Sequence, residues 1–378
     1  MNRQGMATKT AQRLAWEQAL AWRMRRHHLV ERAGRRQMLR VVGDIGGLHA
    51  QVLSSAELSL WARVEGLPSD SVDRALWRRR TLVKLWGMRG TLHLLPAREL
   101  GMWLSALGTI TNRGMTGHPE IDELSEAIGR ALDGRILTRE ELAAEVERAT
   151  GSATFAEWIG FSWGSYLKPA CFRGWLCFAA SEDGRARFTS PATLLGRPVE
   201  QPPPEDAVRE ITRRFLAAYA PATKDDLALW TGFGRARCRK LLAELGDEAV
   251  EVDVEGAPAW VLARDVRRIA STQPTDTARL LPAFDQWTIG ATRRHPAFLD
   301  PRHHARIYRP QGWISPVLLV NGRMVGVWRH AHKGGRLQVE LQPFGRLPAW
   351  ARGQLAAEAA RLAEFFDAEL ELKVVRAG

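Results

Sequence analysis

Residues 224–263, KDDLALWTGFGRARCRKLLAELGDEAVEVDVEGAPAWVLA, contain the pattern that decides the fold. Thr223 precedes this stretch and Asp226 follows three residues later. At this spacing a threonine hydroxyl and an acidic side chain satisfy the free N–H groups at the start of a helix. Apolar residues then recur at helical spacing on both sides of the GFG segment. The first part of the stretch therefore predicts two consecutive amphipathic helices.

The second part of the stretch predicts a β-hairpin. After Gly246 apolar and polar residues alternate, and a tight turn is expected at Glu255 and Gly256. A further helix is predicted over residues 207–219, after the proline-rich linker GRPVEQPPPED. Three helices followed by a hairpin form the winged-helix plan, in which the third helix usually enters the major groove of DNA and the hairpin contacts backbone or minor groove.

The same order of elements occurs twice more, upstream of this copy. The middle copy is predicted to contain a helix over 121–132, a helix capped by Thr138, a helix over about 158–172 and a hairpin turning at 183–184. The first copy is looser, and its predicted elements are helices over 38–43, 54–65 and 71–80 and a hairpin turning at 88–90. The chain is therefore expected to contain three tandem units of one type.

From about Thr277 the pattern changes to strands. Asn321 and Gly322 form a strong hairpin signal, and residues 333–335 form a second turn. A helix over about 348–367 and a final strand close the chain. We expect a small β-barrel-like domain here.

These patterns together predict an α+β protein with three tandem winged-helix units followed by the β-barrel-like domain. The expected boundaries are 1–115 for the first unit, with a basic N-terminal helix, 116–200 for the second, 201–275 for the third and 276–378 for the last domain. Arranged in series, the units are expected to form a C-shaped channel for DNA.

The charge of the chain indicates a polyanionic partner. The formal net charge is +12 over 378 residues, and residues 1–40 alone carry ten lysines and arginines against two acidic residues. An excess of this size favours nucleic acid, although an arginine-rich composition also follows from a GC-rich genome. Basic runs recur in the third helix of the first and third units, at 78–80 and 235–240; each run also fits a solvated helix face.

Several other classes of protein are not indicated. The three cysteines, Cys171, Cys177 and Cys238, are too few and too irregularly spaced for a disulfide framework or a four-ligand zinc site. No phosphate-binding loop ends in Gly-Lys-Ser or Gly-Lys-Thr, and GFGRAR at 232–237 follows no strand, so no nucleotide cofactor is expected. The histidine pairs at 27/28, 303/304 and 330/332 have no carboxylates or thiols at ligand spacing, so no metal is expected either. Without a signal peptide or a long apolar run, we expect a monomeric cytoplasmic protein, associated with the nucleoid and not with a membrane.

Five segments in a fixed order resemble a known family. They are GGLHAQ (46–51), LWARVEG (60–66), MRGTLHLLPAREL (88–100), LLPAFDQ (280–286) and NGRMVGVWR (321–329). This string is similar to the winged-helix DNA glycosylases of the AlkZ/YcaQ type, and the resemblance runs from about residue 14 to the end. The resemblance implies the fold outlined above and a monofunctional glycosylase that acts on duplex DNA carrying an alkylated purine.

The resemblance also implies a catalytic pair in the first segment. Family members carry Gln-x-Gln or Gln-x-Asp in this loop, whereas this chain has His49 in place of the first glutamine and Gln51 at the second position. A His-x-Gln loop is similar to the branch associated with bulky, intercalating guanine adducts of the hedamycin and trioxacarcin kind. The expected function is therefore hydrolysis of the N-glycosidic bond of N7-alkylated guanine, in DNA repair or self-resistance to a genotoxin.

The chemistry of the two side chains suits this role. Alkylation at N7 gives guanine a positive charge, so the base leaves without a strong general acid. His49 can accept a proton from water near neutral pH, and Gln51 can position the water and the sugar but cannot take the proton. The adjacent Gly46 and Gly47 would allow the backbone to approach the DNA sugar. A plainer interpretation is a helix C-cap with His49 inside the core.

Further residues are candidates for contact with DNA. They are basic residues or members of the first hairpin: Arg25, Arg26, Arg89, Thr91, His93, Arg235, Arg237, Lys333 and Arg336. A packed core position for His93 and an exposed basic turn around Lys333 are the alternatives. The alternative function is a non-catalytic winged-helix DNA-binding protein, either a damage binder or a transcriptional regulator.

Overall fold

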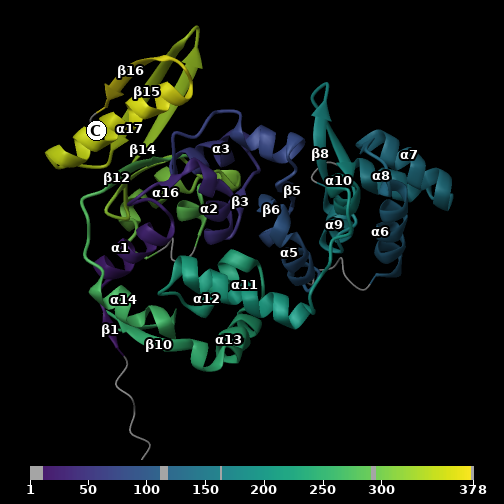
Figure 1. Cartoon of the computed structure of the whole chain (residues 1–378), viewed down its shortest axis with the longest axis horizontal. Helices are drawn as coiled ribbons and strands as arrows, with labels where there is room; N and C mark the ends of the chain where they lie inside the picture. Colours follow the sequence, from purple (N-terminus) through teal and green to yellow (C-terminus); the bar gives the residue numbers. More distant parts are fainter. Residues whose placement is uncertain (1–11, 111–117, 162–163, 291–294, 376–378) are drawn as a thin grey trace, which may run out of the picture.

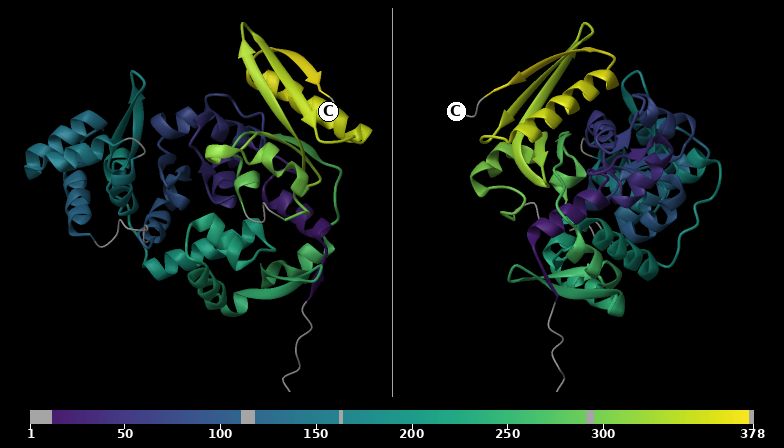
Figure 2. Two further views of the ribbon diagram at one scale, coloured as in Figure 1. Left: turned by 180° about the vertical axis from the view of Figure 1, so that it is seen from behind. Right: turned by 60° about the vertical axis from the view of Figure 1, so that its left-hand side comes forward.

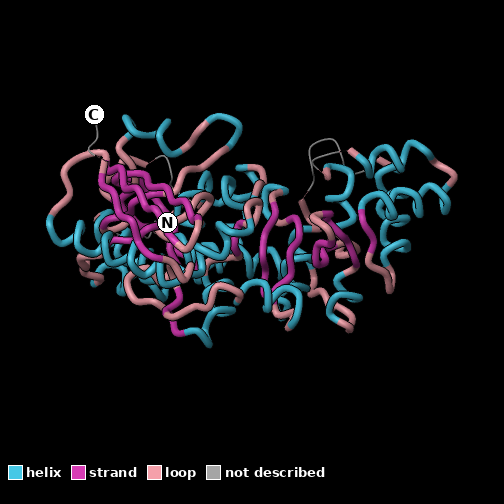
Figure 3. Tube along the Cα trace, turned by 90° about the horizontal axis from the view of Figure 1, so that it is seen from above, coloured by secondary structure: helices cyan, strands magenta, loops and turns pink. Residues whose placement is uncertain are grey.

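The computed structural model describes residues 12–110, 118–161, 164–290 and 295–375, in a mixed α+β architecture (Figure 1). Two of the basic residues counted in the N-terminal stretch, Arg3 and Lys9, lie outside these ranges. The first helical unit occupies the centre of the molecule, the second unit one end and the C-terminal sheet the other, and the third unit lies below the first (Figures 1 and 2). Seen from above, strands gather at the end near the C-terminus, whereas the opposite end is mainly helical (Figure 3).

The third unit matches its sequence pattern closely. Thr223 accepts a hydrogen bond from the backbone N–H of Asp226 at 3.2 Å, and the Asp226 carboxylate accepts one from the N–H of Thr223 at 2.8 Å. The hairpin turns at Glu255 and Gly256, both with positive φ. Its elements are α11 (Pro204–Tyr219), α12 (Lys224–Thr231), α13 (Arg235–Glu244), β10 (Ala249–Val254) and β11 (Ala257–Leu262).

The second unit differs from its prediction at one helix. The helix expected over 158–172 is divided, because α8 ends at Gly160 and α9 begins at Lys168, with residues 162–163 outside the described ranges. Gly164 has a left-handed φ of 64°, and Pro169 has no N–H to donate, so the helix cannot run through. The elements are α6 (Pro119–Leu132), β7 (Leu137–Thr138), α7 (Arg139–Thr150), α8 (Ala153–Gly160), α9 (Lys168–Phe172), β8 (Cys177–Glu182), β9 (Arg185–Thr189) and α10 (Pro191–Leu195).

The first unit follows the predicted order with short helices. Its third helix begins as α4 (Ser71–Asp73) and continues as the π-helical segment η2 (Arg74–Arg78). The remaining elements are α2 (Met38–Asp44), β3 (Leu48–His49), α3 (Leu53–Trp61), β5 (Leu82–Trp86), β6 (Leu92–Pro96) and α5 (Leu100–Leu107), with a small parallel pair of β2 (Ala33–Gly34) and β4 (Val64–Glu65).

A short extended segment before the second helix pairs with the hairpin in all three units. In the first unit β3 pairs antiparallel with β6, and in the second β7 pairs with β9. In the third, Ala222 forms an isolated antiparallel bridge with Trp260. The three units therefore share this strand position, and the strand of the first unit contains His49.

The N-terminal segment packs against the third unit and the C-terminal part of the chain. β1 (Arg13–Leu14) pairs parallel with β10 of the third unit, and α1 (Trp16–Arg26) packs against α11 and α14 (Val266–Ser271). Leu20 and Met24 of α1 also share a core with the C-terminal sheet. The chain returns on itself, so its N-terminal helix joins parts that are distant in sequence.

The C-terminal part is an open sheet, and the β-barrel-like prediction is wrong for the described residues. The strands are ordered β12 (Ala278–Leu281), β13 (Val317–Val320), β14 (Arg323–Lys333), β15 (Arg336–Pro343) and β16 (Glu369–Val374), with β12 and β16 as separate edges. One face is covered by α17 (Ala349–Phe365), which buries Leu355 and Leu362 against the sheet. Alternating apolar residues suit an open or a closed sheet equally, so the pattern could not distinguish them.

The described buried apolar residues form three clusters. One joins β5, β6 and α5 of the first unit to the second and third units, and a second joins the C-terminal sheet to α1 and to Trp61 of α3. The third lies within the first unit, among α2, α3 and the α4–η2 helix. Two short helices, α15 (Gln286–Ile289) and α16 (His304–Ile307), lie between β12 and β13 in sequence. No helix in the described ranges has the length and apolar character needed to cross a membrane.

Candidate active site

The glycines before His49 end helix α2. Gly46 and Gly47 have φ of 76° and 92°, and the N–H of Gly47 bonds the carbonyl of Val42 at 2.8 Å, which is a common helix-terminating arrangement. A Cβ on Gly46 would lie 2.6 Å from the Trp230 ring, and one on Gly47 2.6 Å from a Leu95 methyl group. Both Cα atoms therefore face protein side chains, and the expected approach to a DNA sugar is not the reason for these glycines.

The helix C-cap and the candidate catalytic residue are parts of one turn. After the glycines the chain enters β3, where His49 lies directly opposite His93 of β6 in the antiparallel register. The two imidazole rings are 5.6 Å apart between centroids, at 75° to each other. The C-cap interpretation of the sequence was thus correct for the glycines, and the same turn brings His49 onto a sheet.

His49 is enclosed but carries an unsatisfied nitrogen. Its side chain is 7% exposed, and the Phe284 ring stacks on it with a centroid distance of 5.2 Å and an interplanar angle of 14°. Nδ1 is buried and has no hydrogen-bond partner among the described residues. Burial, and secondarily the charge of Arg89, lower the pKa of His49 to about 4. The imidazole is therefore neutral at pH 7 and can accept a proton or a hydrogen bond.

His93 supports His49 and does not face DNA. It is fully buried, and its Nδ1–H donates to the Thr91 carbonyl at 2.9 Å. Burial, then the neighbouring His49 and Arg89, lower the pKa of His93 well below its usual value. A Cβ on Gly87 would lie 3.0 Å from this ring. The predicted DNA contact for His93 is corrected to a packing position beneath His49.

The C-terminal part contributes a segment that braces the loop. Phe284, with a left-handed φ of 57°, stacks on His49, and the next two side chains point to buried partners. Asp285 pairs with Arg63 through two contacts of 2.7 and 2.8 Å, both side chains being fully buried. Gln286 Nε2 donates to the Gly47 carbonyl at 2.5 Å.

Sequence reasoning did not assign roles to these three residues. LLPAFDQ stood among the segments that carried the family resemblance, but only the folded chain shows what it touches. The signal available in the sequence was the polar pair Asp285-Gln286 at the end of an apolar strand, where a buried polar side chain needs a partner.

The third unit braces the same loop from the other side. The Tyr219 hydroxyl donates to the Ile45 carbonyl at 2.9 Å, and Trp230 packs on Gly46. Arg89, which has a left-handed φ of 60° in the first hairpin, donates to the Trp230 carbonyl at 2.5 Å. Three distant parts of the chain thus hold the loop around His49.

Gln51, two residues after the enclosed His49, is exposed. The backbone N–H of Ala50 bonds the Leu92 carbonyl at 2.7 Å, and Gln51 follows on the bend before α3. The loop therefore presents one enclosed neutral imidazole and one solvent-facing amide, two residues apart. This arrangement provides a nearly enclosed proton acceptor beside an exposed hydrogen-bonding group.

Comparison with known proteins identifies the family. Residues 42–365 match the family model described as DNA glycosylase AlkZ-like. The chain is 36% identical over 363 residues to the interstrand DNA cross-link repair glycosylase of Streptomyces sahachiroi, an alignment that covers 92% of this chain and 96% of that protein. The chain belongs to the AlkZ-like DNA glycosylase family. The solved structure of Streptomyces sahachiroi DNA glycosylase AlkZ superimposes with a TM-score of 0.85, at 34% identity, over 96% of this chain and 100% of that one.

This AlkZ-like glycosylase places several predicted DNA-contact residues in internal contacts. Arg26 Nε donates to the Ala217 carbonyl at 2.8 Å, and Arg237 donates to the carbonyl and hydroxyl of Thr109 at 2.8 and 2.7 Å. Thr91 bonds the Met88 carbonyl at 3.2 Å. Arg237 joins α13 to the residues after α5, so part of its hydrogen-bonding capacity is used within the protein.

Other predicted contact residues of the AlkZ-like glycosylase are at the surface. Arg25 and Arg235 are exposed, the latter 3.0 Å from Asp225. Lys333 and Arg336 stand at the tip of the β14–β15 hairpin, which rises on one side of the first unit in Figures 1 and 2. These four remain candidates for contact with DNA.

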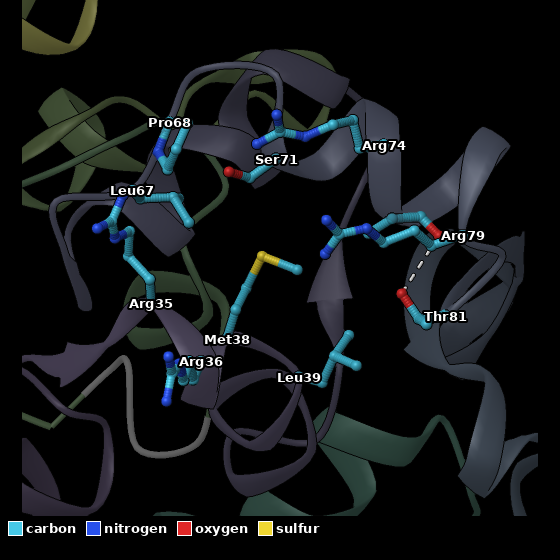
Figure 4. A pocket seen from close by; sticks show the side chains of 11 residues that line it. Arg35, Arg36, Met38, Leu39, Leu67, Pro68, Ser71, Arg74, Arg79 and Thr81 are labelled. Atoms are coloured by element: carbon cyan, nitrogen blue, oxygen red, sulfur yellow. Dashed lines mark hydrogen bonds between the residues drawn. The ribbon is translucent and has the colours of Figure 1, made fainter.

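A cavity in the first unit gathers further arginines that the sequence did not single out as DNA contacts. It has a volume of about 310 Å³ and lies between the start of α2 and the α4–η2 helix, with Met38 in the middle (Figure 4). Arg74 and Arg79 extend toward it from η2 and the residue beyond, and Arg35 lies on the opposite side. Arg74 is 2.9 Å from Asp70, whereas Arg35 and Arg79 have no carboxylate partner among the described residues.

The described residues of the glycosylase contain no group of three or more histidine, cysteine or acidic side chains arranged to hold a metal ion. All three cysteines are buried. Burial raises the pKa of the Cys171 thiol to about 12 and that of Cys177 well above its usual value, so neither is a thiolate nucleophile.

Proposed function

We propose that this DNA glycosylase hydrolyses the N-glycosidic bond of N7-alkylated guanine in duplex DNA, with His49 and Gln51 as the catalytic pair. The observation that carries the proposal is the neutral, nearly enclosed His49 beside the exposed Gln51 in a loop braced by three parts of the chain. An active-site group held this firmly in one position is typical of a catalytic role.

The reaction needs only a weak base. The bond between C1′ and N9 breaks, and its electron pair neutralises the positive charge of the N7-alkylated guanine. Water adds to the resulting oxocarbenium-like C1′, and its proton passes to His49 and then to solvent. Water attacking such a cation becomes acidic as the bond forms, so an imidazole of pKa about 4 suffices as acceptor. The Gln51 amide orients the water and the sugar, and the product is free base and an abasic site.

The proposed substrate is a guanine with a bulky planar adduct. The curated relative is named for interstrand cross-link repair, but the position of its family's first glutamine holds His49 here. Aromatic rings lie beside this position, because Phe284 stacks on His49 and Trp313 in turn contacts Phe284. This convergence supports a site that recognises flat ring systems, whether the role is repair or self-resistance in the cell.

The proposed DNA surface joins the arginine cavity of the first unit to the exposed cations of the hairpins. Arg35 and Arg79 lie on opposite sides of the cavity without a carboxylate partner among the described residues, and an anion between them would be attracted to both. The apolar floor formed by Met38 and Leu67 suits a deoxyribose next to a phosphate. We propose a DNA backbone phosphate as the occupant, and a monomeric cytoplasmic enzyme that acts on the nucleoid.

The test is base release from duplexes that carry either a bulky aromatic N7-guanine adduct or N7-methylguanine. Release by the wild type that falls by about a hundredfold or more in His49→Ala, and less in Gln51→Ala, is the expected result. Loss of release with unchanged DNA binding identifies a chemical role. Binding of damaged DNA without release by the wild type would overturn the proposal in favour of a damage-binding protein, and selective binding of one undamaged sequence would favour a regulator.

A further inference from the structure

Trp313 is an exposed indole connected to the candidate active site. Its side chain is 46% exposed, which is unusual for so large an apolar group. Its ring contacts Phe284 edge to face, with centroids 5.0 Å apart and planes at 79°. Because Phe284 itself stacks on His49, only one ring separates the exposed indole from the imidazole.

The loop that carries Trp313 is closed tightly. Tyr308 forms a bridge with Ile314, and the Arg309 N–H bonds the Trp313 carbonyl at 2.9 Å. Between them Gln311 has a left-handed φ of 60°. A non-glycine residue in this conformation is strained, and such strain is concentrated at binding sites.

The loop is also anchored to the segment that braces His49. The Tyr308 hydroxyl donates to the Thr288 carbonyl at 2.8 Å, in the short helix α15, which begins at Gln286 directly after Asp285. The Ser315 N–H bonds the Ile307 carbonyl at 2.9 Å. The position of Trp313 is therefore fixed relative to the active-site loop, although the indole itself remains open to solvent.

We propose that Trp313 is a stacking platform for a flat aromatic ring system of the damaged nucleotide. A rigid exposed indole offers a large π-face at little cost in conformational entropy, and it binds planar rings without regard to their hydrogen-bonding groups. The positive charge of N7-alkylated guanine strengthens its attraction to the indole face. This proposal rests on the proposed function, since it places the ring system beside His49.

Two sources can supply the ring: the alkylated guanine itself, or the aromatic part of the adduct. Trp313→Ala and Trp313→Phe are compared with the wild type on the aromatic-adduct duplex and on the N7-methylguanine duplex. Equilibrium binding to each duplex and the single-turnover rate are both measured, and circular dichroism checks the fold. Val374→Ala removes an apolar side chain of comparable exposure, 57%, from the edge strand β16 and is the control.

The expected result is a loss of affinity of about tenfold or more in Trp313→Ala, with substantial recovery in Trp313→Phe and no change in Val374→Ala. If Trp313→Ala loses affinity only for the aromatic-adduct duplex, the indole stacks on the adduct. If it loses affinity for both duplexes, the indole stacks on the alkylated guanine. Wild-type affinity for both duplexes in Trp313→Ala, or a phenylalanine variant as weak as the alanine one, would overturn the proposal. If the wild type binds the damaged duplexes but releases no base, the proposed function is refuted. The affinities of the Trp313 variants would still test the stacking role of Trp313 in that case.

Discussion

Gln286 Nε2 donates a hydrogen bond to the Gly47 carbonyl oxygen over 2.5 Å, with the amide side chain buried. The contact joins the segment after β12 to the turn that leads into β3. A left-handed glycine pair is intrinsically free to move, so the turn requires an external restraint. Gln286 supplies it within the same segment that places Phe284 on His49.

Replacement of Gln286 by leucine is expected to lower the rate of base release more than the affinity for DNA. The change leaves the Gly47 carbonyl buried without its donor, which costs about 1–3 kcal/mol of the free energy of unfolding. It also loosens the turn that positions His49. Single-turnover rates, DNA affinity and urea unfolding measure the three quantities. Gln338→Leu, at an exposed residue of β15, is the control and should change stability by less than about 0.5 kcal/mol. Equal losses in both variants would contradict a specific restraint.

The pH dependence of the rate is expected to be flat through the neutral range. His49 must be neutral to accept a proton, and its pKa is lowered to about 4. The rate should therefore hold from pH 8 to pH 5 and fall as the pH approaches 4. Phosphates of bound DNA stabilise the imidazolium and move the fall to higher pH. A single-turnover profile on the N7-methylguanine duplex measures it, and a rate that rises as the pH falls through 6 would instead identify protonated His49 as the active form.

Three enclosed histidines make the fold sensitive to acid. Burial is the main cause that lowers the pKa of His27, His49 and His93, so the unfolded chain binds more protons than the folded one once the pH falls below the ordinary histidine pKa of about 6.5. Their contribution to stability is full above that pH and is lost as the pH decreases toward the folded-state values.

Urea unfolding between pH 7.5 and 5 measures this effect for His27, which packs edge to face on Tyr219 and Trp287 and lies outside the candidate active site. In His27→Phe the decrease of the unfolding free energy with acid should be smaller than in the wild type. An unchanged slope in His27→Phe would show that this histidine does not couple folding to protons.

Local patterns determined how well each element could be predicted from the sequence. The third unit was predicted nearly completely, because the Thr223–Asp226 cap and the Glu255-Gly256 turn depend on neighbouring residues. The prediction of one long helix over 158–172 in the second unit was wrong, because the apolar periodicity was given more weight than Gly164 and Pro169, which divide the helix. The open form of the C-terminal sheet also could not be predicted, because the alternation of apolar and polar residues along a strand does not show whether the two edge strands pair with each other.

The candidate site shows the same division between local and distant information. The glycine turn, His49 and Gln51 are adjacent in sequence, and the resemblance located them. Phe284 and Gln286 act on that turn from the far end of the chain, and the cause is tertiary packing that no local pattern records. The burial of His93 follows from its register opposite His49, which became known only with the strand pairing.

The arginine cavity of the first unit is expected to contribute to the salt dependence of DNA binding. If Arg79 contacts a backbone phosphate, Arg79→Ala should reduce the slope of log affinity against log salt concentration by about one and weaken binding to damaged and undamaged duplexes alike. Arg35→Ala together with Arg79→Ala should reduce it further, because both line the same cavity. Fluorescence anisotropy with a labelled undamaged duplex, over a series of salt concentrations, measures the slope.

The control for this series is Arg302→Ala. Arg302 is exposed, but its guanidinium is paired with the Asp300 carboxylate at 2.6 Å, so it offers little free charge to DNA. Its removal changes the net charge as much as the removal of Arg79 does, and it should leave the slope near the wild-type value. Equal effects of Arg79→Ala and Arg302→Ala would mean that only the overall charge matters, and the phosphate would then not be assigned to the cavity.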